Sequence, residues 1–450
     1  MEPLATNNAI TGPLLDRVME LRWEDGPPDL PLLIKQCLLD WLGVSIAAAT
    51  ALPVQVLRDE LQEQGGHPHA FVFGSSKRLP TQQAALLNGT ISHLLDYDDV
   101  NLTLPGHCTA PVLAAVLALA ERCGASGSVV MNAFLTGYET TCRIALLVAP
   151  AHYTRGFHAT ATIGSLGAAV ACARLIGSDR GATTRSLGIA ATRAAGLKAM
   201  FGTSCKALHV GMAAATGVLA ATLARRGFDS REDAIECAQG FAATHSSDFN
   251  SEAALRDPEG GYHLFNNLFK FHAACYETQA AMECGHQLRR AHGFQPDEIR
   301  AVRLRANRHC NEICNIPEPR TGMEMKFSLR ATAALSLAGL ETARPDAFSD
   351  ENARSSKLNG LREKVAVELT ADLALTESEM DVELHNGQKL TARKDCGIPM
   401  KDRAEQGRRV ADKFHALAAP VLGRRRTDLL TSLVDKMEIS PIEAIAAACV

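Results

Sequence analysis

Apolar residues recur at helical spacing through the first half of the chain. Ala and Leu dominate residues 14–243, and glycines and prolines interrupt them as they do at helix ends. Residues 32–44 are apolar almost all round, which predicts a buried helix. Small residues at 164–169 let helix axes approach closely. We therefore predict an all-helical domain over residues 1–262.

Beyond this point the pattern alternates with the period of a β-strand. Strands are predicted over 299–306, 364–369, 380–385 and 388–393, with a helix over 327–335. Between the last two strands, Asn386-Gly387 predicts a type I′ hairpin turn because both residues tolerate positive φ. The pattern indicates an α+β domain over 263–402. Helical spacing returns after Arg403, so helices in 403–450 are expected to complete the first domain. The predicted fold is mainly α, with two domains.

A dense polar cluster precedes one of the apolar helices. His93-Leu-Leu-Asp96-Tyr-Asp98-Asp99 is followed by Pro-Gly-His107, and an apolar helical run begins at residue 111. Three acids and two imidazoles within fifteen positions, next to core sequence, indicate a functional site.

A helix is expected over residues 81–96, which would place His93 and Asp96 three positions apart on one face. Asp98 and Asp99 would then follow the helix C-terminus, where the macrodipole disfavours anions. Their presence there indicates a requirement other than helix stability. An alternative is that both acids cap the next segment and that His93 is a core histidine. A metal site is a third interpretation, but the sequence has no Glu-x-x-His or His-Glu-x-x-His pairing here, and we predict no metal.

Composition narrows the possible partners and location. The 450 residues are 46% hydrophobic and 21% charged, and the net charge of -4 gives no field for nucleic acid. Thirteen cysteines without a Cys-x-x-Cys pair, of which Cys310 and Cys314 are the closest, indicate a reducing compartment. The N-terminus does not read as a signal peptide, and apolar runs such as 112–120 are about half a membrane span. We expect a cytoplasmic protein with no membrane partner.

Three further groups stand out in apolar surroundings. His158 directly precedes a small-residue helix, whose free N–H groups favour anions, although a surface loop histidine would read the same way. Lys206 follows a glycine-containing loop, and Lys270 lies among aromatic residues. A half-buried lysine is either snorkelling or directed at an anion. No phosphate-loop or dinucleotide fingerprint is present, so no nucleotide cofactor is expected.

Taken in order, these blocks resemble the MmgE/PrpD family. The matching blocks are Asp96-Tyr-Asp-Asp99 with His107, Gly156-Phe-His158, Lys206-Ala-Leu-His-Val-Gly and Phe269-Lys270-Phe-His. The family includes 2-methylcitrate dehydratase, cis-aconitate decarboxylase and iminodisuccinate epimerase. The resemblance implies a helical domain with a smaller α+β lid domain, a homodimer, and catalysis with no metal or organic cofactor.

The resemblance also implies roles for single residues. His158 or Asp96 would be the catalytic base and His107 the catalytic acid. Lys206 and Lys270 would bind the carboxylates of a small polycarboxylate substrate, and we add His93 to the substrate-binding group. Dehydration, in which proton removal next to a carboxylate is followed by loss of water, is the leading reaction because it is the commonest activity attached to the resemblance. Epimerisation and decarboxylation are the alternatives.

Three positions depart from the family pattern. Val100 stands where relatives often have Thr, Gln279 where many have His, and Ala331 where a Tyr is common. If buried, each lost polar contact is worth about 1–3 kcal/mol, so the substrate is expected to differ from that of the best-known members. The same departures favour the rival interpretation, a non-catalytic relative that keeps the fold as a binding protein.

Overall fold

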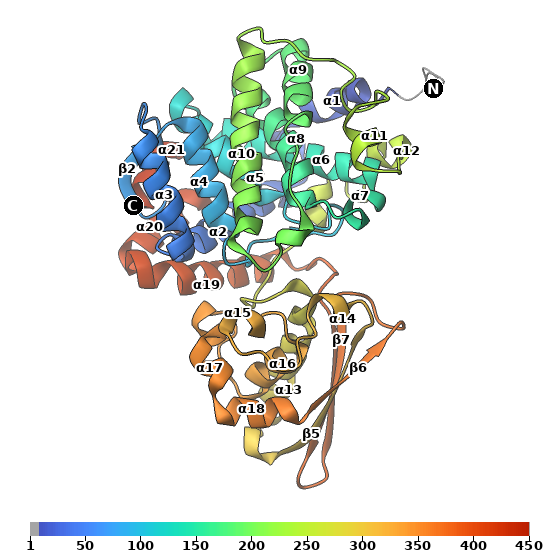
Figure 1. Cartoon of the computed structure of the whole chain (residues 1–450). Helices are drawn as coiled ribbons and strands as arrows, with labels where there is room; N and C mark the ends of the chain where they lie inside the picture. The colour runs from blue at the N-terminus through green and yellow to red at the C-terminus, as the bar shows by residue number, and fades with distance from the viewer. Residues whose placement is uncertain (1–8, 450) are drawn as a thin grey trace. The chain divides into compact units, whose positions relative to one another are not determined.

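The computed structural model describes residues 9–449 of the chain, which fall into two compact units. The first unit comprises the residues up to Leu94, Asp98–Phe269 and those from Lys401 onward, and the second comprises Leu95–Tyr97 and Lys270–Met400 (Figure 1). The protein is mainly α, at 59% helix, as the sequence predicts. The three residues Leu95–Tyr97 belong to the second unit although the chain on either side of them belongs to the first. Asp96 is therefore in the second unit and Asp98 in the first.

The first unit is built from fifteen α-helices among the described residues. They are α1 (Thr11–Met19), α2 (Asp29–Ala48), α3 (Leu52–Gln64), α4 (Thr81–His93), α5 (Thr109–Cys123), α6 (Gly127–Val148), α7 (Ala151–Thr154), α8 (Ala159–Leu175), α9 (Arg180–Ala191), α10 (Ser204–Arg225), α11 (Phe241–His245), α12 (Ser251–Leu255), α19 (Arg403–Leu422), α20 (Arg424–Asp435) and α21 (Ile442–Ala448).

The prediction that the first domain is all-helical is wrong in detail. Two small antiparallel sheets lie in it: β1 (Ala70–Val72) with β2 (Ser75–Leu79), and β3 (Val100–Asn101) with β4 (Asn267–Leu268). The strands of the second sheet have two residues each, so they are too short to leave an alternating pattern in the sequence.

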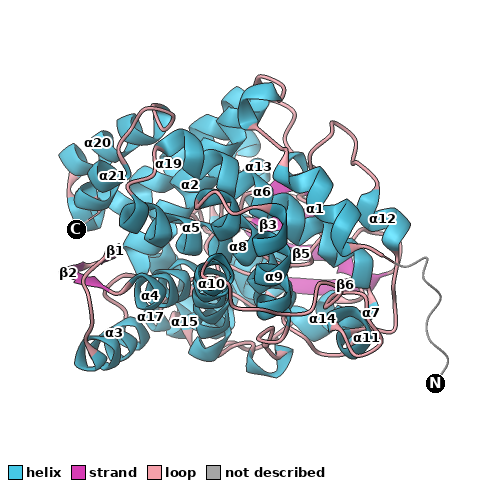
Figure 2. Cartoon of the chain, turned by 90° about the horizontal axis from the view of Figure 1, so that it is seen from above, coloured by secondary structure: helices cyan, strands magenta, loops and turns pink. Residues whose placement is uncertain are grey.

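Helix α10 packs against α4 and α8 through glycines (Figure 2). A Cβ atom on Gly89 would lie 2.9 Å from the Cα of Gly211, and one on Gly217 would lie 2.5 Å from the Cβ of Ala168. Glycine is therefore required at both crossings, and the close packing predicted from small residues is confirmed.

Two helices of the first unit, α2 and α10, have the length and apolar character of a membrane span, with mean hydropathies of 1.4 and 1.6. Within the protein, 72% and 67% of these stretches are buried, as in a core helix. The strictly apolar runs in the sequence are shorter because polar residues such as Lys35 and Asp40 interrupt α2 without offsetting its hydropathy.

The second unit carries a four-stranded sheet in the order β6-β5-β7-β8, formed by β5 (Ile299–Asn307), β6 (Val365–Thr370), β7 (Glu377–Leu384) and β8 (Lys389–Asp395). Its helices are α13 (Gln279–His292), α14 (Cys310–Ile313), α15 (Gly322–Met325), α16 (Leu329–Leu337), α17 (Asp350–Arg354) and α18 (Ser356–Glu363). Short 3₁₀ turns occur in both units. Those of the first unit are Trp23–Asp25, Lys198–Met200 and His263–Asn266, and those of the second are Tyr276–Thr278, Pro296–Glu298 and Pro345–Phe348. Buried residues alternate along β7, and they form a core with α13 and α16. All four predicted strands are confirmed.

The hairpin between β7 and β8 differs from the predicted type I′ turn. The amide of Leu384 donates to the carbonyl of Gln388, so the loop has three residues, and Gly387 alone takes a positive φ, of 87°. A three-residue loop ending in a left-handed glycine is the next most common hairpin, and it uses the same Asn-Gly pair in another register.

Helix α4 ends earlier than the sequence indicates. Its last residue is His93, and Asp96 lies beyond the end with a φ of 52°. The prediction that His93 and Asp96 share one helical face is therefore wrong. A left-handed φ is tolerated by Asp better than by most residues, and here it lets the chain turn out of the helix.

Candidate active site

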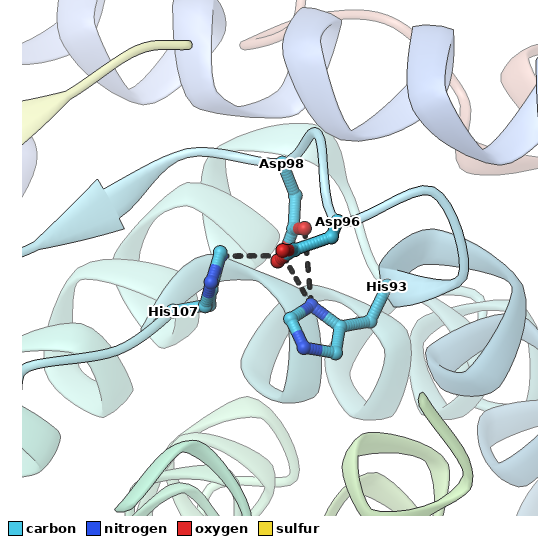
Figure 3. Close-up of side chains that lie close together, drawn as sticks. All are labelled: His93, Asp96, Asp98 and His107. Carbon is cyan, nitrogen blue, oxygen red and sulfur yellow. Dashed lines mark hydrogen bonds and ion pairs between the residues drawn. The ribbon is translucent and has the colours of Figure 1, made fainter. Parts of the chain in front are cut away.

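A carboxylate in the first unit lies between two imidazoles. Both carboxylate oxygens of Asp98 are 3.0 Å from Nδ1 of His93, and Oδ2 is 3.0 Å from Nδ1 of His107 (Figure 3). The centroids of the two rings are 4.5 Å apart. His93 closes α4, and His107 lies two residues before α5, so two helix ends bring the rings to the same acid.

Burial controls the charges of this group. Burial by itself would raise the pKa of Asp98, but the contacts with His107 and His93 outweigh it and hold that pKa well below its usual range. The pKa of His93 falls to about 4, mainly because the ring is buried. At neutral pH Asp98 is therefore ionised and His93 is neutral. Nε2 of His93 is buried with no hydrogen-bond partner among the described residues, which leaves it available to a ligand.

The neighbouring acid, Asp99, has a different role. Its Oδ2 accepts hydrogen bonds from Oγ1 of Thr109 at 2.7 Å and from Nδ2 of Asn267 at 2.9 Å. Burial and the nearby Asp40 raise the pKa of Asp99 to about 7. The N-cap of α5 is Cys108, which makes no side-chain cap, so the alternative in which Asp98 and Asp99 cap this helix is wrong.

His158 brings a third imidazole to the same place. It is the N-cap of α8, and its carbonyl accepts the first hydrogen bonds of that helix, which fixes where its ring points. The ring stacks on His93 with centroids 5.9 Å apart, and its Nδ1 is 3.3 Å from Nδ1 of His209. Burial, reinforced by His93 and Lys206, lowers the pKa of His158 well below its usual range. His158 is thus a neutral imidazole at pH 7.

Lys206 joins this group from the first turn of α10. Its Nζ lies 5.2 Å from the centroid of the Phe201 ring, and its charge contributes to the lowered pKa values of His93 and His158. The structure therefore brings His93, His107, His158 and Lys206 together in the first unit.

A second cluster lies in the second unit and contains amines in place of imidazoles. Nζ of Lys270 donates to the carbonyl of Asp96 at 2.6 Å and lies 3.2 Å from Oδ1 of the same residue. Nζ of Lys326 donates to the carbonyl of Leu95 at 3.3 Å. The two lysines are only 1% and 7% exposed. Two buried amines therefore gather around one carboxylate.

Electrostatics in this second cluster favour an anion. The pKa of Lys326 falls to about 8, mainly because the amine is buried; Asp96 opposes this fall, and the charge of Lys270 adds to it. One carboxylate thus acts on two buried amines. A carboxylate ligand would supply compensating charge.

The first-unit cluster also has metal-ligand character. One ligand atom each from His93, Asp98 and His107 lie within 4.8 Å of one another, so the group could hold an ion. In the structure Oδ2 of Asp98 already lies 3.0 Å from the Nδ1 atoms of both rings. The absence of a metal remains a prediction, and a chelator tests it.

Sequence reasoning assigns no catalytic or binding role to three residues that the structure places here: Asp98, His209 and Lys326. Asp98 belongs to the predicted polar cluster, but its partner His107 is nine positions away, so sequence spacing does not pair the two. The sequence does point to Lys326, because this lysine stands between Met325 and Phe327. Lys270 likewise stands among aromatic residues. His209 follows Lys206 by three positions, which on a helix is the same face.

The departures from the family pattern have structural roles. Oε1 of Gln279 accepts from the amides of Phe271 and His272, and its Nε2 donates to the carbonyl of His272. Gln279 therefore holds the loop that follows Lys270. Val100 is buried in β3, and Ala331 is buried in α16.

Comparison with known proteins agrees with this arrangement. Residues 13–254 match the MmgE/PrpD N-terminal domain, and residues 272–438 match the MmgE/PrpD C-terminal domain. The cis-aconitate decarboxylase-like protein oryM of Aspergillus oryzae is 26% identical over 312 residues, which is 65% of either chain and so just under two thirds of that protein.

Two mammalian relatives match over more of their length. Cis-aconitate decarboxylase of Mus musculus is 26% identical over 425 residues, covering 90% of this chain and 86% of the relative. The Homo sapiens protein of the same name is 25% identical over 422 residues with the same coverage. With both domain families matched in order over most of its length, the chain belongs to the MmgE/PrpD family.

Proposed function

We propose that this protein is a lyase that acts on a small polycarboxylate by acid–base catalysis, without metal or organic cofactor. One observation carries the proposal: an ionised carboxylate, Asp98, orients His107 beside a neutral imidazole, His158. A carboxylate on Nδ1 fixes the tautomer of an imidazole and stabilises the imidazolium that forms at Nε2. A neutral imidazole can accept a proton.

In this scheme His158 removes the proton from carbon next to a carboxylate. His107 enters the cycle as an imidazolium whose Nδ1–H faces Asp98, and it delivers the proton from Nε2. His93 and Lys206 bind substrate oxygens in the first unit, and Lys270 and Lys326 bind a carboxylate in the second. Asp96, which we also considered as the base, is engaged by Lys270, and hydrogen bonds to a carboxylate weaken it as a base.

Dehydration of a hydroxy-polycarboxylate makes use of both groups. The C–H electron pair forms the double bond as His158 takes the proton, the C–O bond breaks, and the proton from His107 turns the leaving hydroxide into water. Two titratable groups whose surroundings give them different pKa values can act as the base and the acid of one reaction.

Decarboxylation of cis-aconitate is the second candidate, because the relatives described above carry that name. Here a C–C bond breaks to release carbon dioxide, its electron pair stays on the substrate, and the imidazolium of His107 delivers a proton to carbon. A homodimer in the cytoplasm is the setting that we propose on the family resemblance.

The test uses purified protein with citrate, 2-methylcitrate and cis-aconitate in deuterated water, followed by NMR. A dehydratase forms an alkene from one of the hydroxy acids, a decarboxylase releases carbon dioxide from cis-aconitate and places deuterium on the product, and an epimerase exchanges hydrogen without net loss of either group. Protein that binds these acids but neither converts them nor exchanges their carbon-bound hydrogen would support the non-catalytic interpretation.

A further inference from the structure

A base as deeply buried as His158 needs a way to lose the proton that it takes. Its side chain belongs to a residue only 3% exposed, and His93, Lys206, His209 and His107 all disfavour a charge on its ring. After each removal of a substrate proton, His158 is an imidazolium in this environment. The enzyme can start a new cycle only after the proton has left.

His209 provides a neighbour for that proton. Its Nδ1 lies 3.3 Å from Nδ1 of His158, and the ring centroids are 5.5 Å apart. His209 projects from α10 and is partly exposed, whereas His158 is buried. Gly196, with a φ of 146°, lies beside the pair, and a Cβ atom there would lie 2.8 Å from the Cβ of Ala161.

Two Nδ1 atoms in hydrogen-bond contact require one donor and one acceptor. If His209 donates, His158 carries its own hydrogen on Nε2 and cannot act as a base there. If His209 accepts, His158 holds its hydrogen on Nδ1 and presents the lone pair of Nε2 to the substrate. Only the second arrangement is consistent with His158 as the base.

We propose that His209 is a proton relay between His158 and solvent, an inference that rests on the function proposed above. Nε2 of His158 takes the proton from carbon, the Nδ1 proton of His158 passes to Nδ1 of His209, and Nε2 of His209 releases its own proton to water or buffer. Two of the four nitrogens gain one proton and two lose one, and both rings end neutral but with their tautomers exchanged. Rotation of both rings restores the starting tautomers.

The surroundings of His209 suit this role. Burial lowers its pKa, so the ring is neutral at pH 7 and can accept a proton. Lys206 on the same helix, His93 and His107 all disfavour a charge on His158, whereas burial alone lowers the pKa of His209. This difference favours movement of a positive charge from His158 to His209.

The relay is tested by comparing His209→Gln with wild type in single-turnover and steady-state experiments on citrate, 2-methylcitrate and cis-aconitate. Chemistry in the first turnover should change little, because Gln can still accept the hydrogen bond from His158. Steady-state kcat should fall about 10- to 100-fold, the lower range for a positioned acid or base, and added imidazole should restore much of it. The matched control is His385→Gln, which replaces an exposed histidine on the β7–β8 loop.

Other outcomes would overturn the relay. Equal losses in the first and later turnovers, without rescue by imidazole, would indicate a merely structural contact. Nitrogen-15 NMR gives a readout that needs no substrate: a proton on Nδ1 of His209 in the resting protein would rule out the required tautomer. If wild type converts a probe acid and His158→Gln does not, normal turnover of His209→Gln rejects the relay alone. Inactivity of wild type on every probe rejects the proposed function instead.

Discussion

Each of the two clusters contains one acidic and two basic side chains, but the basic groups differ in kind. In the first unit one carboxylate, Asp98, meets two imidazoles, and in the second unit one carboxylate, Asp96, meets two amines. All of the basic side chains are buried. Burial takes the charge off an imidazole at neutral pH, since its usual pKa is about 6.5, but leaves a lysine charged unless the shift is several units.

The two clusters are therefore suited to different functions. In the first unit, burial lowers the pKa of His93 to about 4 and holds that of His158 well below its usual range, so these two rings are neutral at pH 7. In the second unit, even the lowered pKa of about 8 leaves Lys326 mainly protonated at pH 7, so the cluster attracts anions. The same burial therefore suits one cluster to proton transfer and the other to binding carboxylates.

The most severe test of this comparison exchanges each acid for its amide. Asp98→Asn keeps the shape but removes the charge that orients His107, and a loss of kcat of about 10³- to 10⁴-fold is expected, as when a carboxylate that orients a catalytic imidazole is removed. Asp96→Asn should instead remove a negative charge beside two buried amines and lower the thermal stability. Steady-state kinetics and thermal unfolding on both variants check this. Similar kinetic losses in both would remove the distinction.

The next largest effect is expected at the base. His158→Gln retains a hydrogen-bonding side chain but cannot transfer a proton, so kcat should fall about 10²- to 10⁴-fold while substrate binding persists. Single-turnover rates and equilibrium binding are measured on one preparation, with circular dichroism as the check on folding. A folded variant with near-normal turnover would move the role of base to Asp96 or His107.

A smaller effect is expected at the lysines. Lys206→Ala and Lys270→Ala each remove a charged partner of a carboxylate, worth about 1.5–3 kcal/mol, so KM should rise about 10- to 100-fold with a lesser change in kcat. Lys389→Ala, on the exposed side of β8, is the matched control. Unchanged kinetics in both lysine variants would place them outside the binding site.

Most of the fold could be predicted from the sequence. Helical spacing, strand alternation and the glycine-rich helix crossings are local patterns, and the elements they predict were found, including α10 against α4 and all strands of the larger sheet. What failed depends on single backbone conformations. The end of α4 at His93 and the left-handed Asp96 leave no periodic signal, and neither do the two-residue strands β3 and β4.

For the site, sequence reasoning identified the imidazoles and lysines but not the acid that organises them. His93, His107 and His158 stand out because imidazoles are rare beside core sequence. Which of Asp96, Asp98 and Asp99 contacts the imidazoles depends on where helix α4 ends. An error of two residues in that position exchanges the predicted contacts of Asp96 and Asp98. Asp98 binds the rings, Asp99 binds Thr109 and Asn267, and Asp96 binds Lys270.

The dependence on pH sharpens the comparison further. Because the folded pKa of Lys326 is near 8 and its ordinary value is 10.5, the unfolded chain holds the extra proton between these values. The free energy of unfolding should therefore gain a contribution as pH rises from about 8 to 10.5. Substrate affinity should move the other way, approaching a tenfold rise in KM per pH unit above about 8 if protonated Lys326 is required. Lys326→Met should lose both trends, and persistence of the KM trend in that variant would assign it to another group.

The smallest effect is expected from chelation, and it tests the first cluster directly. Because both Nδ1 atoms already contact Asp98, a divalent ion would have to displace those contacts or use Nε2 atoms, and the ionised acid is already stabilised by the rings. Exhaustive dialysis against a chelator should therefore leave turnover unchanged, and elemental analysis of the active protein should find no stoichiometric metal. Loss of turnover that a divalent ion restores would make His93, Asp98 and His107 a metal site, and the first unit would then act through a Lewis acid in place of paired imidazoles. Asp98→Asn separates the two cases, because it would also abolish metal binding if the group were a ligand set, whereas in a metal-free site it changes only the rate.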